Sequence, residues 1–320
     1  GLVYRPMPKR SFVIRGAYGL FYNTMTGNRS ASAAANLPFW GVESVSYGLK
    51  QLQPWETVWS ADPNAFGIFS IGESQDPRIR PARTQEWNAT IQTALPFQSA
   101  MTVSYVGTIV DREVVLVPYN APAVGAHTNL QADRPNPLIG SVSRLENYGR
   151  NWYHGLQAKV ERRFAAGLAY TFSYSFSRSL GQNSNGADEG TSVLAFSPAW
   201  YNRGRTPFDY RHVEFATLLW EIPFGHGRKF RPDANRVLDA IAGGWNFTLT
   251  QQARSGQPLS ISGGYSNLGN GDGTRADLIG SPSISNPSAA MWFNTAAFAR
   301  PALYSWGSSP LGVLEGPGFL

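Results

Sequence analysis

The chain contains no cysteine among its 320 residues. A disulfide framework, a cysteine-bound zinc ion and a thiol nucleophile are therefore excluded. Charge is also scarce, because Asp, Glu, Lys and Arg make up 15% of the chain, whereas a typical soluble domain has roughly 25%. Aromatic residues reach 13%, so a water-soluble body of this composition would struggle to cover its surface with polar groups. A body surrounded by lipid would meet no such difficulty.

Long apolar runs are missing as well. No stretch approaches 18 consecutive apolar residues, so the sequence predicts no transmembrane helix. The chain begins with Gly1, and basic residues and prolines stand where a signal peptide would have its apolar core. We therefore expect the chain to be a piece of a longer or processed protein, with any export signal upstream.

Basic residues outnumber acidic ones, which gives a formal net charge of +6. They are scattered, and the densest group is Arg228, Lys229, Arg231 and Arg236 in a Gly- and Pro-rich segment. No basic helix and no RNA-binding aromatic motif accompanies them. The sequence thus indicates a solvated turn and no nucleic-acid partner.

The clearest pattern is a strict alternation over residues 168–177. Large apolar residues take every second position, and the positions between them hold Ser, Thr and Ala. The apolar members are Leu168, Tyr170, Phe172, Tyr174 and Phe176. Successive side chains of a strand point to opposite faces, so one face is apolar and the other small and polar. This division is typical of a barrel strand between lipid and a wet interior.

The same alternation returns elsewhere, with Gln, Thr, Asn or charged residues opposite the apolar ones. The segments are 86–95, 101–105, 152–164 and 244–254, with weaker contrast in 12–22. Strands of about 10–13 residues exceed the usual length in soluble sheets and suit a tilted crossing of a bilayer. Trp87, Trp152 and Trp245 are each expected near a strand end, where an aromatic girdle lies. In 210–222 the parity of apolar residues changes, which predicts a β-bulge near Ala216.

Connections alternate between short and long. Pro96-Phe97 and Ala165-Ala166-Gly167 predict tight turns, and 223–243 predicts a longer turn with one helical turn near 237–241. The other connections are long, at about 24–81, 109–151, 180–209 and 256–320. Outer-membrane barrels have this arrangement, with the short turns in the periplasm.

Several segments also follow one another in a characteristic order. They are NWYHGLQAKVERRF at 151–164, YTFSYSFSRS at 170–179, FDYRH at 208–212, IPFG at 222–225, GGW at 243–245, SGQP at 255–258, WFN at 292–294 with AF at 297–298, and GPG at 316–318. Their order and spacing resemble the barrel of TonB-dependent receptors of the Oar-like group, which is abundant in Acidobacteria. The resemblance covers most of 80–320.

The resemblance implies a barrel of roughly 22 strands, plugged by an N-terminal domain, that imports a bulky ligand with energy from the inner membrane. This chain holds only about eight strands of such a barrel and no recognisable plug or TonB box. By this resemblance, residues 1–320 are part of one barrel domain, and the plug domain and the terminal strands are expected outside this chain. The TonB system would be reached through that plug.

No motif predicts catalysis. The histidines His127, His154, His212 and His226 form no i, i+4 pair with each other or with a carboxylate. His154 is interpreted as an interfacial or structural residue. His212 is expected to join Asp209 and Arg211 in a polar cluster at a strand mouth.

Other polar segments have simpler interpretations than a site. Segment 270–277 superficially resembles a calcium loop, but Leu268 and Ile279 occupy ligand positions. Asp188 and Glu189 are expected at a solvated loop tip. On the polar face, Lys159, Glu161 and Arg163 are expected to form cross-strand salt bridges. The sequence therefore predicts no catalytic residue, no cofactor and no metal site.

The predicted fold is all-β, an antiparallel transmembrane β-barrel segment in the outer membrane of a Gram-negative bacterium, with membrane lipid as a partner. The resemblance implies a TonB-dependent receptor whose long loops bind a glycan, a peptide or a metal chelate. A passive porin or an adhesin would share these strands. A soluble β-sandwich or propeller would bury the same apolar faces against protein, and a secreted β-rich hydrolase would need a carboxylate or Ser-His constellation that is absent.

Overall fold

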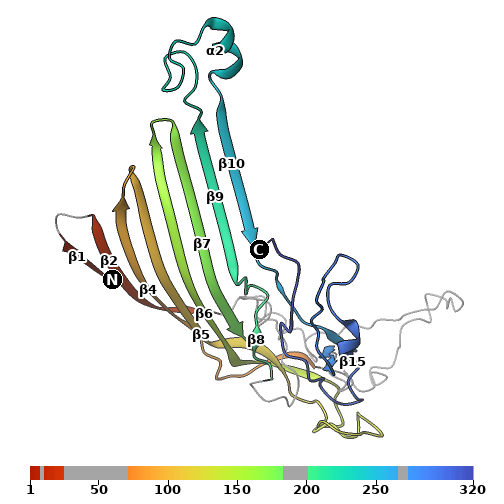
Figure 1. The fold of residues 1–320 in the computed structure, drawn as a ribbon. Helices are drawn as coiled ribbons and strands as arrows, with labels where there is room; N and C mark the ends of the chain where they lie inside the picture. The colour runs from red at the N-terminus through yellow and green to blue at the C-terminus, as the bar shows by residue number, and fades with distance from the viewer. Residues whose placement is uncertain (8–10, 25–70, 183–200, 266–272, 320) are drawn as a thin grey trace, which may run out of the picture.

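The computed structural model describes residues 1–7, 11–24, 71–182, 201–265 and 273–319. One large sheet dominates it, and eight strands follow one another through this sheet in sequence order, each antiparallel to the next (Figure 1). They are β1 (Leu2–Met7), β2 (Phe12–Asn23), β4 (Ala82–Leu95), β5 (Ser99–Pro118), β6 (Val142–Ala165), β7 (Leu168–Gly181), β9 (His212–Glu221) and β10 (Asn246–Arg254). The predicted antiparallel fold of about eight strands is confirmed.

Short elements surround one end of this sheet. Strand β3 (Ile71–Gln75) pairs in parallel with β6, and β8 (Gly204–Arg205) pairs with β7. The pairs that follow the sheet are β11 (Pro258–Leu259) with β16 (Leu314–Glu315), β12 (Ser262–Tyr265) with β13 (Gly273–Arg275), and β14 (Asp277–Leu278) with β15 (Phe298–Ala299). A 3-10 turn, η2, covers Thr295–Ala297. No helix among the described residues is long and apolar enough to cross a membrane.

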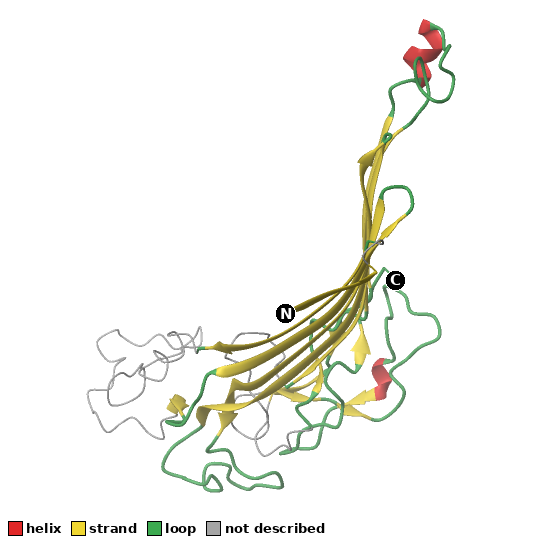
Figure 2. Cartoon of the chain, turned by 90° about the vertical axis from the view of Figure 1, so that its left-hand side faces the viewer, coloured by secondary structure: helices red, strands yellow, loops and turns green. Residues whose placement is uncertain are grey.

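The sheet is strongly curved when seen from the side (Figure 2). Within the described strands, β1 and β10 are its two edges, since each pairs with one neighbour in the main path. The sheet therefore forms part of a barrel wall and does not close on itself.

Tight turns join the strands at one end. Ala166 and Gly167 have φ values of 51° and 77°, the left-handed conformation that two-residue hairpins require. Phe97 and Gln98 are also left-handed. The β9–β10 connection carries helix α2 (Arg236–Ala242), whose first turn is capped by the Asn235 side chain accepting from Leu238 N. Both tight turns and the helical turn are confirmed, and α2 lies at the end of the sheet opposite the long connections (Figure 1).

Strand pairing places side chains of one kind on each face. Phe172 pairs with Val160 and Ala216, whereas Ser173 pairs with Lys159 and Phe215. We call the face that carries Phe172 the apolar face and the one that carries Ser173 the polar face. Exposed side chains of the apolar face include Tyr4, Ile14, Tyr18, Ile91, Tyr105, Leu156, Phe172, Phe176, Trp220 and Phe247.

These side chains are uncovered. Phe172 is 42% exposed and Trp245 is 60% exposed, whereas a sandwich would enclose them in a core. The polar face carries mostly Ser, Thr, Asn and Gln, and its Thr90 and Ser104 hydroxyls lie 2.9 Å apart. An uncovered apolar surface of this extent would be unstable in water, so its natural surroundings are hydrocarbon.

Strands β5 and β6 continue well past the rest of the sheet. The predicted connection at 109–151 is therefore wrong, since it shrinks to the segment between Pro118 and Val142. The bilayer sets the length of a membrane crossing but not the length of a strand that continues outside it. For the same reason the prediction that Trp152 lies near a strand end is wrong, because Trp152 lies in the interior of β6.

The other two tryptophans lie closer to strand ends. Trp245 directly precedes β10, as predicted, and its Nε1 donates to Ile241 O at 2.9 Å. Trp87 lies in the first half of β4. It faces the end of the sheet that carries the long connections.

The continuation of β5 and β6 begins at a bulge. Arg112 has a φ of 61°, and the β5–β6 register shifts between Asp111 and Val114. Beyond it lies a hydrophobic core of Val114, Leu116 and Leu145, with Ile79 packed against it. The buried core of the described chain is therefore outside the barrel wall.

Strand β9 has no bulge near Ala216, so that prediction is wrong. Its pairing with β10 runs without interruption from Val213 opposite Arg254 to Glu221 opposite Asn246. Pairing with β7 is equally regular. The change in parity arises because β9 carries apolar residues on both faces, with Phe215 on the polar one.

Candidate functional site

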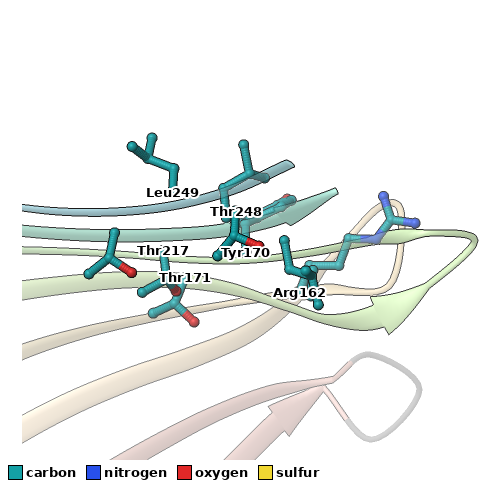
Figure 3. Close-up of a pocket in the computed structure, with 10 residues that line it drawn as sticks. Arg162, Tyr170, Thr171, Thr217, Thr248 and Leu249 are labelled. Atoms are coloured by element: carbon teal, nitrogen blue, oxygen red, sulfur yellow. The ribbon is translucent and has the colours of Figure 1, made fainter. Parts of the chain in front are cut away.

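The polar face forms the inner wall of the barrel segment. Four of its threonines come from three neighbouring strands and line a shallow hollow of about 170 Å³ (Figure 3). They are Thr171, Thr217, Thr248 and Thr250. Their hydroxyls can donate and accept hydrogen bonds without fixing a charge, so this wall can be wetted by water or passed by a polar solute.

Two charges on the polar face pair with each other on one strand. Lys159 Nζ lies 2.5 Å from Glu161 Oε2 on the same strand. The predicted cross-strand salt bridges are therefore wrong, because Lys159 stands opposite Ser173 and Thr102. Arg163 forms no ion pair with any described residue.

Two histidines lie on the apolar face toward the end that carries the long connections. His154 Nδ1 lies 2.7 Å from the Tyr105 hydroxyl, and its ring meets Trp87 edge-on at 6.0 Å. His212 Nδ1 lies 2.7 Å from the Tyr174 hydroxyl. His154 is exposed among aromatic side chains, which fits its interpretation as an interfacial residue.

The predicted polar cluster around His212 is built differently. Asp209 is fully buried; it accepts from Ser179 N at 2.6 Å and pairs with Arg205 at 2.6 Å. Arg211 lies 4.0 Å from the same carboxylate. His212 instead lies against Tyr174 and Phe176, and the Arg211 guanidinium lies 5.9 Å from the same Phe176 ring.

The remaining histidines lie in the connections. His127 Nδ1 is 2.8 Å from Asp133 Oδ2, and its Nε2 is 2.6 Å from Ala123 O. The carboxylate, with that carbonyl, raises the pKa of His127. His226 contributes its backbone N–H to Asp239 Oδ1.

A larger cavity, of about 410 Å³, opens among the long connections. Its lining comes from four separated parts of the chain. The residues are Val124, Tyr201, Asp277, Ser305, Trp306, Gly307 and Ser308. The lining combines two aromatic rings with one carboxylate, a mixture of apolar surface and few polar groups that is common in ligand sites.

Hydrogen bonds between these segments hold the cavity together. The Tyr201 hydroxyl donates to Trp306 O at 2.6 Å, and the two rings lie 5.1 Å apart. Asp277 Oδ1 accepts from Ser308 N at 2.8 Å. These contacts leave the second carboxylate oxygen of Asp277 without a hydrogen bond to a described residue.

Arg275 links two of the segments that form the cavity. It donates to Ser309 O at 2.7 Å and to Tyr201 O at 2.8 Å, and its guanidinium lies 3.7 Å from the Tyr201 ring centroid. Burial lowers the pKa of Arg275. Burial also raises the pKa of the Tyr201 phenol, and the nearby Arg275 guanidinium partly offsets this rise. No sequence motif marks these residues, because folding alone brings the segments together.

Two of the weighed motifs lie outside the described residues, namely Asp188-Glu189 and the part of the calcium-like segment at 270–272. In the rest of that segment, Arg275 and Asp277 belong to the cavity just described. Among the described residues, no group of three or more His, Asp or Glu could hold a metal ion.

Curvature, an uncovered apolar face and a polar face together define the wall of a transmembrane β-barrel. The outer membrane beta barrel domain family matches residues 1–320. The chain therefore belongs to this family and resides in the outer membrane, so the soluble β-sandwich alternative is excluded.

A solved outer-membrane protein is similar to part of this chain. It is the outer membrane transporter YddB from Escherichia coli, with 11% identity and a TM-score of 0.49 over 81% of this chain. This chain spans only 28% of that protein. No curated protein matches the chain.

Proposed function

We propose that this chain is the barrel portion of a TonB-dependent outer-membrane receptor, which binds a ligand outside the cell and imports it with energy from the inner membrane. The observation that carries this proposal is the aromatic cavity at the end of the sheet with the long connections. Short turns face the periplasm in barrels of this kind. The cavity then lies on the extracellular side, where a solute arrives.

The polar face supports the second part of the proposal. A solute that leaves the cavity meets a wall of Thr, Ser, Asn and Gln side chains, including the threonine hollow. Hydroxyl and amide groups exchange hydrogen bonds readily with a passing polar solute. Energised import rests on the resemblance of the segments between 151 and 318 to the Oar-like receptors, and we propose no catalytic step.

The lining of the cavity also indicates which class of ligand it would bind. Trp306 and Tyr201 offer aromatic surface, and Asp277 offers a hydrogen-bond acceptor. Glycans and peptides carry both apolar patches and donor groups, so we favour them over a metal chelate.

Binding is tested on cells that display the full-length protein, with fluorescent oligosaccharides, short peptides and a ferric siderophore as probes. We expect Trp306→Ala and Asp277→Asn to weaken binding of one probe class by about tenfold, the loss of one good contact. Met291→Ala is the matched control, because Met291 is exposed and outside the cavity lining. Unchanged binding in both cavity variants would refute the ligand site.

Uptake is tested separately with a protonophore and in a strain without TonB. We expect uptake of the bound probe to stop in both cases while surface binding persists. Uptake that continues would favour the passive porin, and binding without uptake in untreated cells would favour the adhesin.

A further inference from the structure

Three arginines lie on the apolar face at the end that carries the long connections, which outer-membrane barrels turn outward. We name Arg150, Arg178 and Arg203 the arginine rim. On β7 the outward series Phe172, Tyr174 and Phe176 ends at Arg178. Arg178 stands directly opposite His154 on β6. The rim therefore begins where the apolar band of the wall stops.

Two of the three rim arginines converge on Trp152. The Arg203 guanidinium lies 4.2 Å from the centre of the indole ring, and the Arg150 guanidinium lies 5.1 Å from it. Arg203 reaches this ring from the segment before β8, so two separate parts of the chain converge on it. Cation–π contacts hold guanidinium groups in place without neutralising them.

The rim has no acidic partner among the described residues. All three arginines are exposed, and none of them forms an ion pair with a described residue. Neighbouring carboxylates are already engaged, since Asp111 pairs with Arg83 and the buried Asp209 pairs with Arg205. Like charges this close repel each other, so the arrangement favours an external anion.

We propose that the arginine rim binds the phosphate groups of a phosphorylated glycolipid in the outer leaflet of the outer membrane. Two observations select a lipid over a soluble anion. The guanidinium groups stand at the edge of the lipid-facing band, and exposed Leu156 and Phe176 continue directly below them as a surface for acyl chains. Guanidinium groups bind phosphate oxygens in pairs, and basic clusters next to a membrane recognise anionic headgroups.

The test uses the full-length protein in nanodiscs of phosphatidylcholine that contain either bisphosphorylated lipid A or its dephosphorylated form. Native mass spectrometry counts the lipid A molecules retained by each protein. We expect Arg150→Gln, Arg178→Gln and Arg203→Gln together to reduce retention of the bisphosphorylated form by about tenfold or more. The dephosphorylated form is expected to be retained weakly by every variant.

A matched control removes the same charge elsewhere. Lys229→Gln, Arg231→Gln and Arg236→Gln act on exposed residues of the connection that carries α2, at the opposite end of the sheet. This control is expected to retain lipid as the unchanged protein does. Arg203→Gln alone, outside the strands, guards against misfolding of the triple variant and is expected to reduce retention by about threefold.

Three outcomes would overturn the proposal. One is equal retention by the rim variant and the control. Another is equal retention of the phosphorylated and dephosphorylated lipids, which would mean that the arginines only extend toward water from the interface. A third is displacement of the lipid by inorganic phosphate at equal concentration, which would indicate a site for soluble anions.

Discussion

The barrel wall and the extension of β5 and β6 share these two strands but are stabilised in opposite ways. In the wall, residues such as Leu156 and Phe172 are 49% and 42% exposed on the apolar face. Beyond the bulge at Arg112, Val115 and Leu145 are fully buried. The bulge thus separates a region solvated by lipid from one that folds as a soluble domain does.

This difference shows that one alternating pattern has two meanings. Within the bilayer, backbone hydrogen bonds must be satisfied by neighbouring strands, and the apolar face needs no protein cover. In water the same apolar side chains require a packed core. The extension obtains one where Ile79 packs against Val114, Leu116 and Leu145, while β3 pairs with its β6 strand.

The largest effect is expected from Leu145→Ala in the extension. A fully buried leucine replaced by alanine leaves a cavity and costs about 2–5 kcal/mol. Hydrogen exchange of the protein in detergent should show faster local opening of the extended parts of β5 and β6, with the wall unchanged.

Leu156→Ala is the matched control on the same strand. Leu156 is 49% exposed, so it lacks the enclosing protein contacts that make a cavity costly. If both variants opened the extension equally, the distinction between the two regions would fail.

Phe172→Arg gives the next largest effect and tests the wall. An arginine facing the bilayer midplane costs about 2–4 kcal/mol. Ser173→Arg is expected to cost much less, because Ser173 lies on the polar face beside Lys159 and Phe215. Folding into lipid vesicles, followed by denaturant titration, measures both. Equal tolerance at the two positions would reverse or remove the assignment of the faces.

The alternation in the sequence was sufficient to predict the wall. Strict two-residue periodicity fixes which side chains share a face, and the small residues Ala165-Ala166-Gly167 predict a tight turn. A local pattern therefore predicted strands, faces and short turns.

The remaining errors have physical causes. The apolar run at residues 114–117 is itself a strand signal, but it lacks the apolar–polar alternation of the wall, so the alternation alone does not extend β5 this far. In β9, apolar residues on both faces produce a change of parity in the sequence that looks like a bulge, although its pairing is regular. The cavity joins Val124, Tyr201 and Trp306, which are distant in sequence, so only the folded chain brings them together.

The smallest effect concerns the connection between β5 and β6. His127 contacts Asp133 and Ala123 O, and the carboxylate raises the pKa of the imidazole above its ordinary value. A group whose pKa is raised by folding stabilises the folded state below its unfolded pKa. This contribution disappears as the pH rises through the folded pKa. Ordering of the segment around His127 should therefore decrease between mildly acidic and mildly alkaline pH.

Asp133→Asn removes the main cause of that shift. NMR titration of the His127 ring should then give a pKa close to the ordinary value, and the pH dependence of proteolysis within 119–141 should flatten. The stability of the wall should not change with the protonation of His127. No hydrogen bond between described residues joins the wall to His127 or Asp133. A pKa for His127 that is the same with and without the Asp133 carboxylate would show that the extension owes its order to its apolar core alone.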